Sequence, residues 1–494
     1  MSPLLVTSAQ TESLPETAAL ELVPRNCTLK PYTKTSVPQF SIASDFIAYA
    51  SPDSTYAVTR RLMDAASDEI IIGIYDFSAD YMKDLVLHTM KRGVKVYLML
   101  DIDSKDEQAL FDELKKFGCK AVPAPSCAAK TNRYFPSSHE KVIVIDRRWT
   151  LVQSGNYSAN SIPFNEKDGG DPKHFVTGNR DMGVAIRSRP LADFFAKILR
   201  ADMKLELGGG AIEAAEAPPT APHPDLVEAM PKHIPAELFP SKQFTSGAAI
   251  KVVPVLSPDN YMTVVPDLLR AAKKSIHIEQ QYIRSEHPEI VTLLDAIKAA
   301  RQKNAALDVR IILGKLFAAK DVPKEKKNLD TLRKVYGLRL GNHIRYIDVN
   351  RFVHCHNKLV IIDGTAVLVS SQNWSRTAVA QNREAGLVIR YPALARQLGS
   401  LLDHHAARAR PHQHHVAQVL VEEQLRDLSS VRADGDPGAH ELAALASAVE
   451  RRREDEMAGG AQPRGDGLPD PASLVRAVDQ DVGRHRVSFV RFEA

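Results

Sequence analysis

Apolar positions along the chain follow two alternating spacings, and the same order of spacings occurs twice. Short apolar runs predict β-strands at 69–75 and 94–100, and apolar residues three and four positions apart predict a helix at 82–91 between them. The second copy repeats this order at 275–279, 290–301 and 309–313. Two β-α-β units therefore follow each other along the chain.

The repeat begins before these units. Ser51-Pro52-Asp53 and Ser257-Pro258-Asp259 each precede an amphipathic stretch, at 56–66 and 261–274. Strands that alternate with helices of this length predict right-handed crossovers and a sheet covered on both faces. The expected fold class is α/β, with two α/β/α halves and mostly parallel sheets.

A segment rich in Gly, Ala and Pro at 208–222 indicates a linker between the halves. Turn formers, mixed charge and few aromatic residues predict weak order at both ends of the chain, apart from a short β-like run at 487–492. The expected organisation is a flexible N-terminal segment at 1–42, a first half at 43–206, a linker at 207–247, a second half at 248–425 and a weakly ordered tail at 426–494.

Composition limits the choice of class without naming an activity. The 494 residues are enough for two to four structural units, and 44% apolar and 25% charged residues are typical of a soluble protein. A net charge of +4 neither requires nor excludes a polyanionic partner. The first 20 residues lack a basic leader followed by an apolar run, and no stretch has the ~20 apolar residues of a membrane span. We expect a cytoplasmic enzyme that meets any lipid at the membrane surface.

The four cysteines do not form a C-x-x-C pair, which argues against a zinc knuckle or a redox pair and favours a reducing compartment. They are Cys27, Cys119, Cys127 and Cys355. Strand alternation directs Cys355 away from His356 and towards the core, so we expect a core thiol there.

Each half carries one His-x-Lys-x4-Asp motif. The motif residues are His139, Lys141 and Asp146 in the first half, and His356, Lys358 and Asp363 in the second. On an extended strand the His and Lys project to the same face. An imidazole can attack phosphorus or protonate a leaving alcohol, and an ammonium can stabilise the developing oxyanion. The pattern therefore predicts phosphodiester chemistry.

Two further matched pairs follow the motifs. Asn156 and Asn373 lie ten residues beyond the motif aspartates. Their amides, with the hydroxyls of Ser154 and Ser371, are candidates for binding phosphate oxygens, although asparagine is also common in turns. Asn-Arg-acid elements then place Asp181 and Glu384. Either acid could orient a catalytic imidazole, or form a salt bridge to the preceding arginine.

Together these elements, over residues 46–392, resemble the duplicated HKD motifs of the phospholipase D superfamily. The resemblance implies a single-chain pseudo-dimer with both motifs at one active site. It implies a phosphohistidine on His139, with His356 as acid and base, Glu384 against His139 and Asp181 against His356. Asp146 and Asp363 would brace the motif loops.

No cofactor or metal is implied by the resemblance. The histidines near the end of the second half lack companion acids at ligand spacing, so we expect a solvated helix end there. They are His404, His405, His412, His414 and His415.

Three substrate classes share these motifs: phospholipid headgroups that are hydrolysed or transferred, cardiolipin-type synthesis, and metal-independent nonspecific cleavage of DNA or RNA. Two motifs on one chain favour a lipid enzyme, and the lack of apolar spans weakens the synthase reading. The flanks at 155–158 and 371–375 resemble nuclease-like members. Basic residues before the second motif suit a phosphate backbone or anionic headgroups; they are Lys315, Lys320, Lys324, Lys326, Lys327, Arg333 and Lys334. We expect a monomeric phospholipase D, with a nuclease as the alternative.

Overall fold

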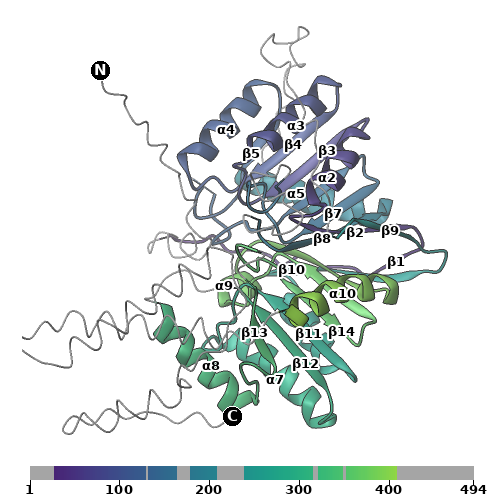
Figure 1. Cartoon of the computed structure of the whole chain (residues 1–494). Coiled ribbons are helices and arrows are strands. Elements are labelled where there is room, and N and C mark those ends of the chain that lie inside the picture. The colour runs from purple at the N-terminus through teal and green to yellow at the C-terminus, as the bar shows by residue number, and fades with distance from the viewer. Residues whose placement is uncertain are drawn as a thin grey trace, which may run out of the picture. The chain divides into compact units, whose positions relative to one another are not determined.

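The computed structural model describes residues 27–129, 132–163, 178–207, 239–314, 321–348 and 352–408. Within them, each half of the chain contains one eight-stranded sheet with helices packed on it, the first half above the second in Figure 1. Both halves belong to one compact unit. The α/β class and the two-repeat organisation predicted from the sequence are confirmed.

The first half contains β2 (Asp45–Ser51), α2 (Thr55–Asp64), β3 (Glu69–Ile74), α3 (Asp80–Lys91), β4 (Lys95–Leu100), α4 (Lys105–Lys116), β5 (Lys120–Pro123), β6 (Val142–Ile145), β7 (Trp149–Gln153), β8 (Asp181–Arg187) and α5 (Arg189–Glu206). Its sheet has the order β5-β4-β3-β6-β7-β8-β2-β9, where β9 is Lys242–Thr245. The predicted β-α-β unit is formed by β3, α3 and β4.

The second half repeats this plan with β10 (Ile250–Ser257), α6 (Tyr261–Arg270), β11 (Ser275–Gln280), α7 (Pro288–Lys303), β12 (Asp308–Leu313), α8 (Val322–Tyr336), β13 (Ile344–Tyr346), β14 (Leu359–Ile362), β15 (Ala366–Ser370), α9 (Arg376–Ala380), β16 (Glu384–Arg390) and α10 (Pro392–Arg408). Its sheet order, β13-β12-β11-β14-β15-β16-β10-β1, matches the first sheet strand for strand. The strand β1 is Phe40–Ile42.

Both sheets are mixed, so the expectation of mostly parallel sheets is wrong. Only the strands joined by helical crossovers, such as β3 and β4, run parallel, and the other pairs are antiparallel. For β6 and β7, and for β14 and β15, the reversal lies in the turn that joins them. Asp146 and Arg147 both have φ of 49°, and Asp363 and Gly364 have φ of 56° and 62°. Two consecutive residues of positive φ make a tight hairpin turn, which reverses the chain.

Each sheet is completed by a strand from outside its own half (Figure 1). β1, which precedes the first half, pairs with β10 of the second sheet, and β9, which precedes the second half, pairs with β2 of the first. The flexible segment expected at 1–42 and the linker expected at 207–247 therefore both contribute edge strands. These strands are too short to give a clear periodic signal.

The interface between the halves is part of the hydrophobic core. One cluster of buried apolar side chains contains residues of both halves, among them Phe195 and Leu199 of α5 and Leu359 of β14. Two other clusters fill one half each. Strands β7 and β8 also pack against β15 and β16. Because burying apolar surface is the main stabilising term, the shared cluster holds the halves together.

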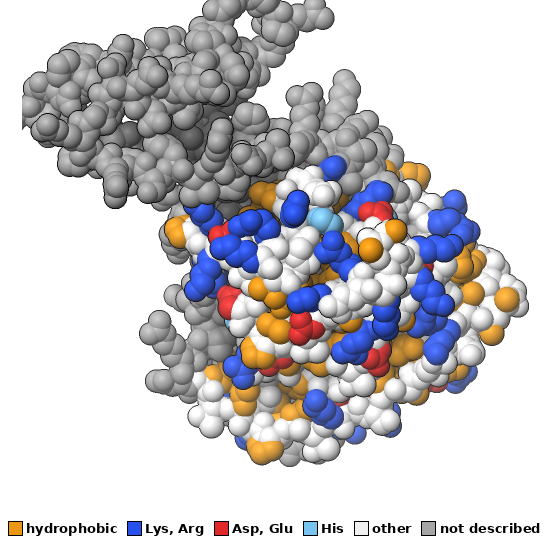
Figure 2. Space-filling view, turned by 90° about the horizontal axis from the view of Figure 1, so that it is seen from below, with side chains coloured by type: hydrophobic (Ala, Val, Ile, Leu, Met, Phe, Trp, Pro, Cys, Tyr) orange, Lys and Arg blue, Asp and Glu red, His pale blue; other side chains and the backbone are white. Residues whose placement is uncertain are grey.

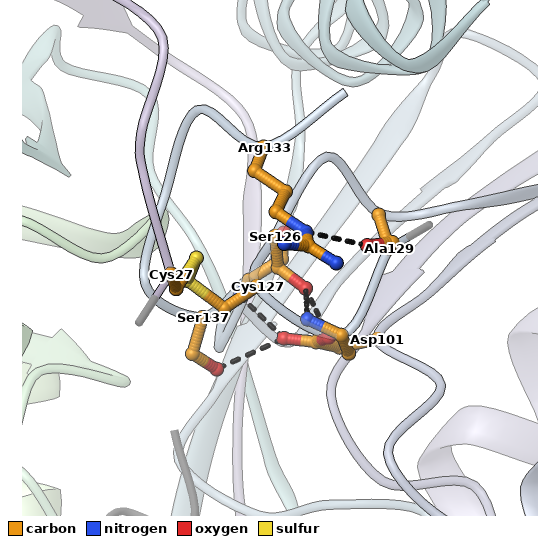
Figure 3. Close-up of a disulfide and its surroundings, with 9 residues drawn as sticks. Cys27, Asp101, Ser126, Cys127, Ala129, Arg133 and Ser137 are labelled. Atoms are coloured by element: carbon orange, nitrogen blue, oxygen red, sulfur yellow. Dashed lines mark hydrogen bonds between the residues drawn. A yellow bond between two sulfur atoms is a disulfide. The ribbon is translucent and has the colours of Figure 1, made fainter. Parts of the chain in front are cut away.

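Cys27 and Cys127 form a disulfide with 5.8 Å between their Cα atoms (Figure 3). This corrects the expectation that all cysteines are reduced, because disulfides are typical of oxidising compartments. The cytoplasmic assignment therefore loses its cysteine argument. Cys119 and Cys355 are buried thiols, and Cys355 lies in the shared cluster, as strand alternation predicted.

No helix within the described ranges is long and apolar enough to cross a membrane. The linker residues 208–238, Lys315, Lys320 and the tail at 426–494 lie outside the described residues. The same holds for His412, His414 and His415 and for the side chains of His404 and His405 in α10.

Candidate active site

The two motif histidines and lysines lie in extended segments directly before β6 and β14. All four side chains are buried, with at most 2% of their surface exposed. The apolar residues after them form the strands, so the motif divides into a polar approach and a core strand. The residues belonging to this set are His139, Lys141, His356 and Lys358.

Each motif segment forms a backbone bridge with the Asn-Arg-acid element of the other half. The amide of His139 donates to the carbonyl of Arg383 at 2.7 Å, and the amide of Arg383 donates to the carbonyl of Ser137 at 2.9 Å. The reciprocal bonds join His356 to Arg180 at 2.9 Å and Arg180 to His354 at 2.8 Å. The two motifs are thereby fixed at one interface.

Side chains repeat this cross-half pairing. Nδ1 of His139 lies 2.8 Å from Oε2 of Glu384, and Nδ1 of His356 lies 2.7 Å from Oδ1 of Asp181. These are the contacts that the resemblance implied. Burial by itself raises the pKa of Asp181, but His356, Lys358 and a serine hydroxyl together hold that pKa below its usual value. The carboxylate is therefore maintained in its charged form next to the imidazole.

The alternative for these acids, salt bridges to the preceding arginines, is not what forms. Arg180 binds Asp53 instead, and Arg383 binds Asp202 and Asp259. Asp53 and Asp259 are the aspartates of the repeated Ser-Pro-Asp triplets. The repeat of these triplets is visible in the sequence, but the ion pairs of their aspartates were not predicted.

The lysines are held by their own motif segments. Nζ of Lys141 donates to the carbonyl of His139 at 2.7 Å, and Nζ of Lys358 donates to that of His356 at 2.8 Å. Lys141 also lies 5.2 Å from the ring centre of Tyr75, whose ring is 4.8 Å from that of His139. Tyr75 was predicted only as the end of a strand. A buried ammonium at this place supplies positive charge for an anionic group.

The serines differ from expectation. The hydroxyl of Ser154 donates to Asp181 at 2.7 Å, and that of Ser371 donates to Glu384 at 2.5 Å. Both hydroxyl groups therefore direct their protons at the histidine-bonded acids.

The two asparagines are buried beside the serines. Oδ1 of Asn156 and both side-chain polar atoms of Asn373 have no hydrogen-bond partner among the described residues. Buried amides usually have partners, so an amide without one is a candidate for contact with substrate.

Asp146 and Asp363 brace the hairpin turns. Asp146 accepts from the amides of residues 67, 68 and 69, and Asp363 accepts from those of residues 273, 274 and 275. Burial raises the pKa of Asp146, but these backbone donors outweigh it and hold the pKa below its usual value. Each aspartate ties the turn after its motif strand to the strand next to it.

The residue between the motif His and Lys differs between the halves. Glu140 is buried next to Ser138, and burial, aided by Asp202, raises its pKa to about 8. The second half has Asn357 at this position, which donates to Glu279 of the adjacent strand. Gly73, in the matching position on β3, leaves the room that Glu140 occupies. Each half thus has a buried carboxylate behind the motif, which lies in the motif segment in the first half and on the adjacent strand β11 in the second.

The family profile described as "Cardiolipin synthase, PLD-like domain" matches residues 59–203 and 265–406, which is more than half of the chain. The protein therefore belongs to the phospholipase D superfamily, in which it carries two copies of the family domain. The resemblance inferred from the motifs is confirmed.

Solved structures of several activities share similarity with the chain. Phosphatidylserine synthase of Haemophilus influenzae Rd KW20 is 15% identical, with a TM-score of 0.47, over 85% of this chain and 94% of its own. Nuc of Salmonella typhimurium, a phospholipase D family member, is 20% identical with a TM-score of 0.27, over 33% of this chain and 95% of its own. NucT of Helicobacter pylori is 14% identical with a TM-score of 0.25, over 34% and 97%. No curated protein matches the chain.

Proposed function

We propose that this protein is a phospholipase D-type enzyme that hydrolyses or transfers phospholipid headgroups through a phosphohistidine. One observation carries the proposal: two imidazoles at one interface, each bonded to an acid of the other half and each beside a buried lysine. That arrangement supplies a nucleophile, a proton donor and two cations for one phosphodiester.

In the first step, His139 attacks phosphorus and the headgroup alcohol leaves. The attack is assigned to Nε2, since Nδ1 is directed at Glu384. The P–O bond to the headgroup breaks, His356 gives its proton to the leaving oxygen, and the P–N bond forms. Glu384 stabilises the positive charge that develops on the imidazole. Lys141 and Lys358 stabilise the charge on the phosphoryl oxygens.

In the second step, His356 takes a proton from water or from an acceptor alcohol. The activated oxygen attacks phosphorus, the P–N bond breaks, and His139 is regenerated. Water gives hydrolysis, and an alcohol gives headgroup transfer. These steps use only side chains of the chain itself, so the reaction is proposed to be independent of metal ions.

Three observations support the lipid assignment. The matching family profile carries the description of cardiolipin synthase, and both motifs lie on one chain. The surface suits an anionic bilayer, because Figure 2 shows the second half from below with more Lys and Arg than Asp and Glu. Five basic side chains of α8 are exposed: Lys324, Lys326, Lys327, Arg333 and Lys334. These charges would attract anionic headgroups, and also nucleic acid, which is the alternative substrate.

The test is turnover by the purified chain in EDTA, with three substrates offered in parallel. Mixed phospholipid vesicles report headgroup release, added butanol reports transfer, and plasmid DNA reports nicking. We expect headgroup release or exchange on the lipids and intact DNA. Nicking without lipid turnover would replace the lipid assignment with a nuclease, and inactivation by EDTA would overturn the metal-free chemistry.

The histidine variants test the mechanism itself. His139→Ala and His356→Ala are each expected to lose activity by several orders of magnitude. His88→Ala, an exposed histidine of α3, is the matched control and is expected to retain full activity. Full turnover by His139→Ala would overturn the proposed nucleophile.

A further inference from the structure

The arginine of each Asn-Arg-acid element is clamped between two aromatic rings from different parts of the chain. The guanidinium carbon of Arg383 lies 5.3 Å from the ring centre of Tyr32 and 5.1 Å from that of Phe135. Arg180 lies 4.7 Å from Phe239 and 5.0 Å from Phe352.

The two clamps follow one rule. Phe135 and Phe352 each stand four residues before a motif histidine, while Tyr32 and Phe239 each precede one of the exchanged edge strands β1 and β9. Each clamp therefore includes a ring from the segment leading into an exchanged strand. A planar guanidinium is well suited to stacking between such rings.

The clamp on Arg383 has more bonds than its counterpart. Arg383 donates to Asp202 through Nε at 2.6 Å and to Asp259 through Nη1 at 2.6 Å. The other oxygen of Asp259 accepts from the hydroxyl of Tyr32 at 3.1 Å and from the amide of Thr35 at 2.5 Å. By contrast, Nε and Nη2 of Arg180 have no partner among the described residues.

The N-terminal residues 27–39 are here called the strap. Through Tyr32 the strap contacts Arg383, which is bonded to the backbone of His139. Arg383 is followed directly by Glu384, which binds the His139 side chain. The carbonyl of Arg383 accepts from the His139 amide. A shift of Arg383 would move both bonds to His139, one at its imidazole and one at its backbone amide.

The disulfide joins the strap to the approach of the same histidine (Figure 3). Cys127 follows Ser126, whose hydroxyl donates to Asp101 at 2.5 Å. Asp101 also accepts from the hydroxyl of Ser137 and the amide of Ser138, the two residues before His139. The strap is therefore tied at one end to the His139 approach and at the other, through β1, to the second sheet.

We propose that the strap is a positioning element for His139, with Tyr32 as its key side chain, and that the Cys27–Cys127 disulfide makes this positioning dependent on redox state. The inference rests on the proposed role of His139. The strap acts on His139 through Arg383 and Glu384.

The redox step needs a dithiol reductant, such as dithiothreitol. The dithiol gives two electrons and two protons to the disulfide, which becomes two thiols, and the dithiol closes to its own cyclic disulfide. Once released, the strap keeps only its noncovalent contacts, and the Tyr32 ring is held less firmly over Arg383.

The experiment compares oxidised and reduced full-length protein on a soluble diester, bis(p-nitrophenyl) phosphate, at a temperature where both stay folded by circular dichroism. We expect reduction to lower kcat roughly tenfold or more while KM changes less than twofold, since misplacement of a reacting group costs rate and not binding. In oxidised protein, Tyr32→Ala is expected to lower kcat to a similar extent, with Tyr32→Phe intermediate.

Two controls keep the result specific. Leu29→Ala alters an exposed side chain of the same strap and is expected to match the unaltered protein. Cys27→Ser should already show the low kcat and should not respond to reductant, which excludes effects through Cys119 or Cys355. Unchanged kcat in both reduced protein and Tyr32→Ala would overturn the proposal.

A direct readout separates this proposal from the proposed function. The downfield NMR signal of the imidazole proton bonded to Glu384 is identified by its loss in His139→Ala. We expect the signal to weaken or disappear in reduced protein and in Tyr32→Ala. If His139→Ala turns over normally, the proposed function fails. The NMR signal still tests whether the strap positions His139 against Glu384. A signal unchanged by reduction and by Tyr32→Ala would overturn the strap alone.

Discussion

His139 of the first half and Glu384 of the second are joined at 2.8 Å across the interface between the repeats. Asp181 and His356 form the reciprocal pair at 2.7 Å. Each half therefore supplies the acid that is bonded to the other half's imidazole. One repeat by itself would hold a histidine without the carboxylate that is bonded to it here.

Replacing Glu384 by Gln should remove the charge beside His139 while preserving the shape of the side chain. An amide cannot stabilise the imidazolium and favours the wrong tautomer, so kcat should fall roughly 10³- to 10⁴-fold, as when the acid of a triad becomes an amide. Steady-state kinetics on a soluble phosphodiester measure this. Glu286→Gln, at a half-exposed surface position, is the control. A loss below tenfold would contradict the orienting role.

Asp146 should matter for stability more than for rate. Asp146→Ala leaves three backbone amides without their acceptor and places alanine at a φ of 49°. We expect the free energy of unfolding to fall by about 1–3 kcal/mol, with kcat changed only a few-fold. Asp146→Asn keeps an acceptor and tolerates this φ, so it should lose less. Urea denaturation measures the difference, and equal losses for the two variants would count against the bracing role.

Glu140 should give the protein a pH-dependent stability. Its pKa is raised from 4.5 to about 8, so between these values the folded protein keeps a proton that the unfolded chain has lost. Stability should therefore fall by about 1.4 kcal/mol per pH unit as pH rises through this window, and level off above about pH 8.

Glu140→Gln should remove this slope, because the amide does not titrate. It still offers an oxygen to the Ser138 hydroxyl, so little is lost at low pH. Urea denaturation from pH 5 to pH 9 compares the two proteins. Parallel curves would show that Glu140 does not titrate in this window.

The disulfide should contribute strongly to stability. It links residues 100 positions apart. Closing a loop of about this length lowers the entropy of the unfolded chain, which raises the free energy of unfolding by roughly 4–5 kcal/mol. Reduction, or Cys27→Ser, should lower the midpoint of thermal unfolding. The Cys27→Ser protein should not respond further to reductant. A midpoint insensitive to reductant in the unaltered protein would contradict this.

Much of the fold could be predicted from local patterns. The strands and helices of both repeats follow from apolar spacing, because each buries one face against its neighbours. The direction of the strands after the motifs did not follow. In the first half that direction is set by Asp146 and Arg147, whose residue types do not mark such a turn as glycine does. In the second half the Asp363-Gly364 pair does mark it, and that signal was not used.

The site could be predicted as far as its residue types were repeated. The motif residues and the acids appear twice, and the structure brings them together at one interface. The bonds of Ser154 and Ser371 to the two acids were not predicted, because a serine hydroxyl is equally suited to a phosphate and to a carboxylate. The partner of Cys27 could not be deduced, since pairing depends on distance in the fold and not on spacing in the chain.

The exchanged edge strands have a consequence for how the molecule comes apart. β1 completes the second sheet and β9 the first. A cut between residues 207 and 239 would therefore leave two fragments, each of which carries an edge strand of the other's sheet. Each fragment would expose an unpaired sheet edge until the other arrived, and the two should associate tightly when expressed together from separate genes. Each half of the chain therefore depends on the other for a complete sheet.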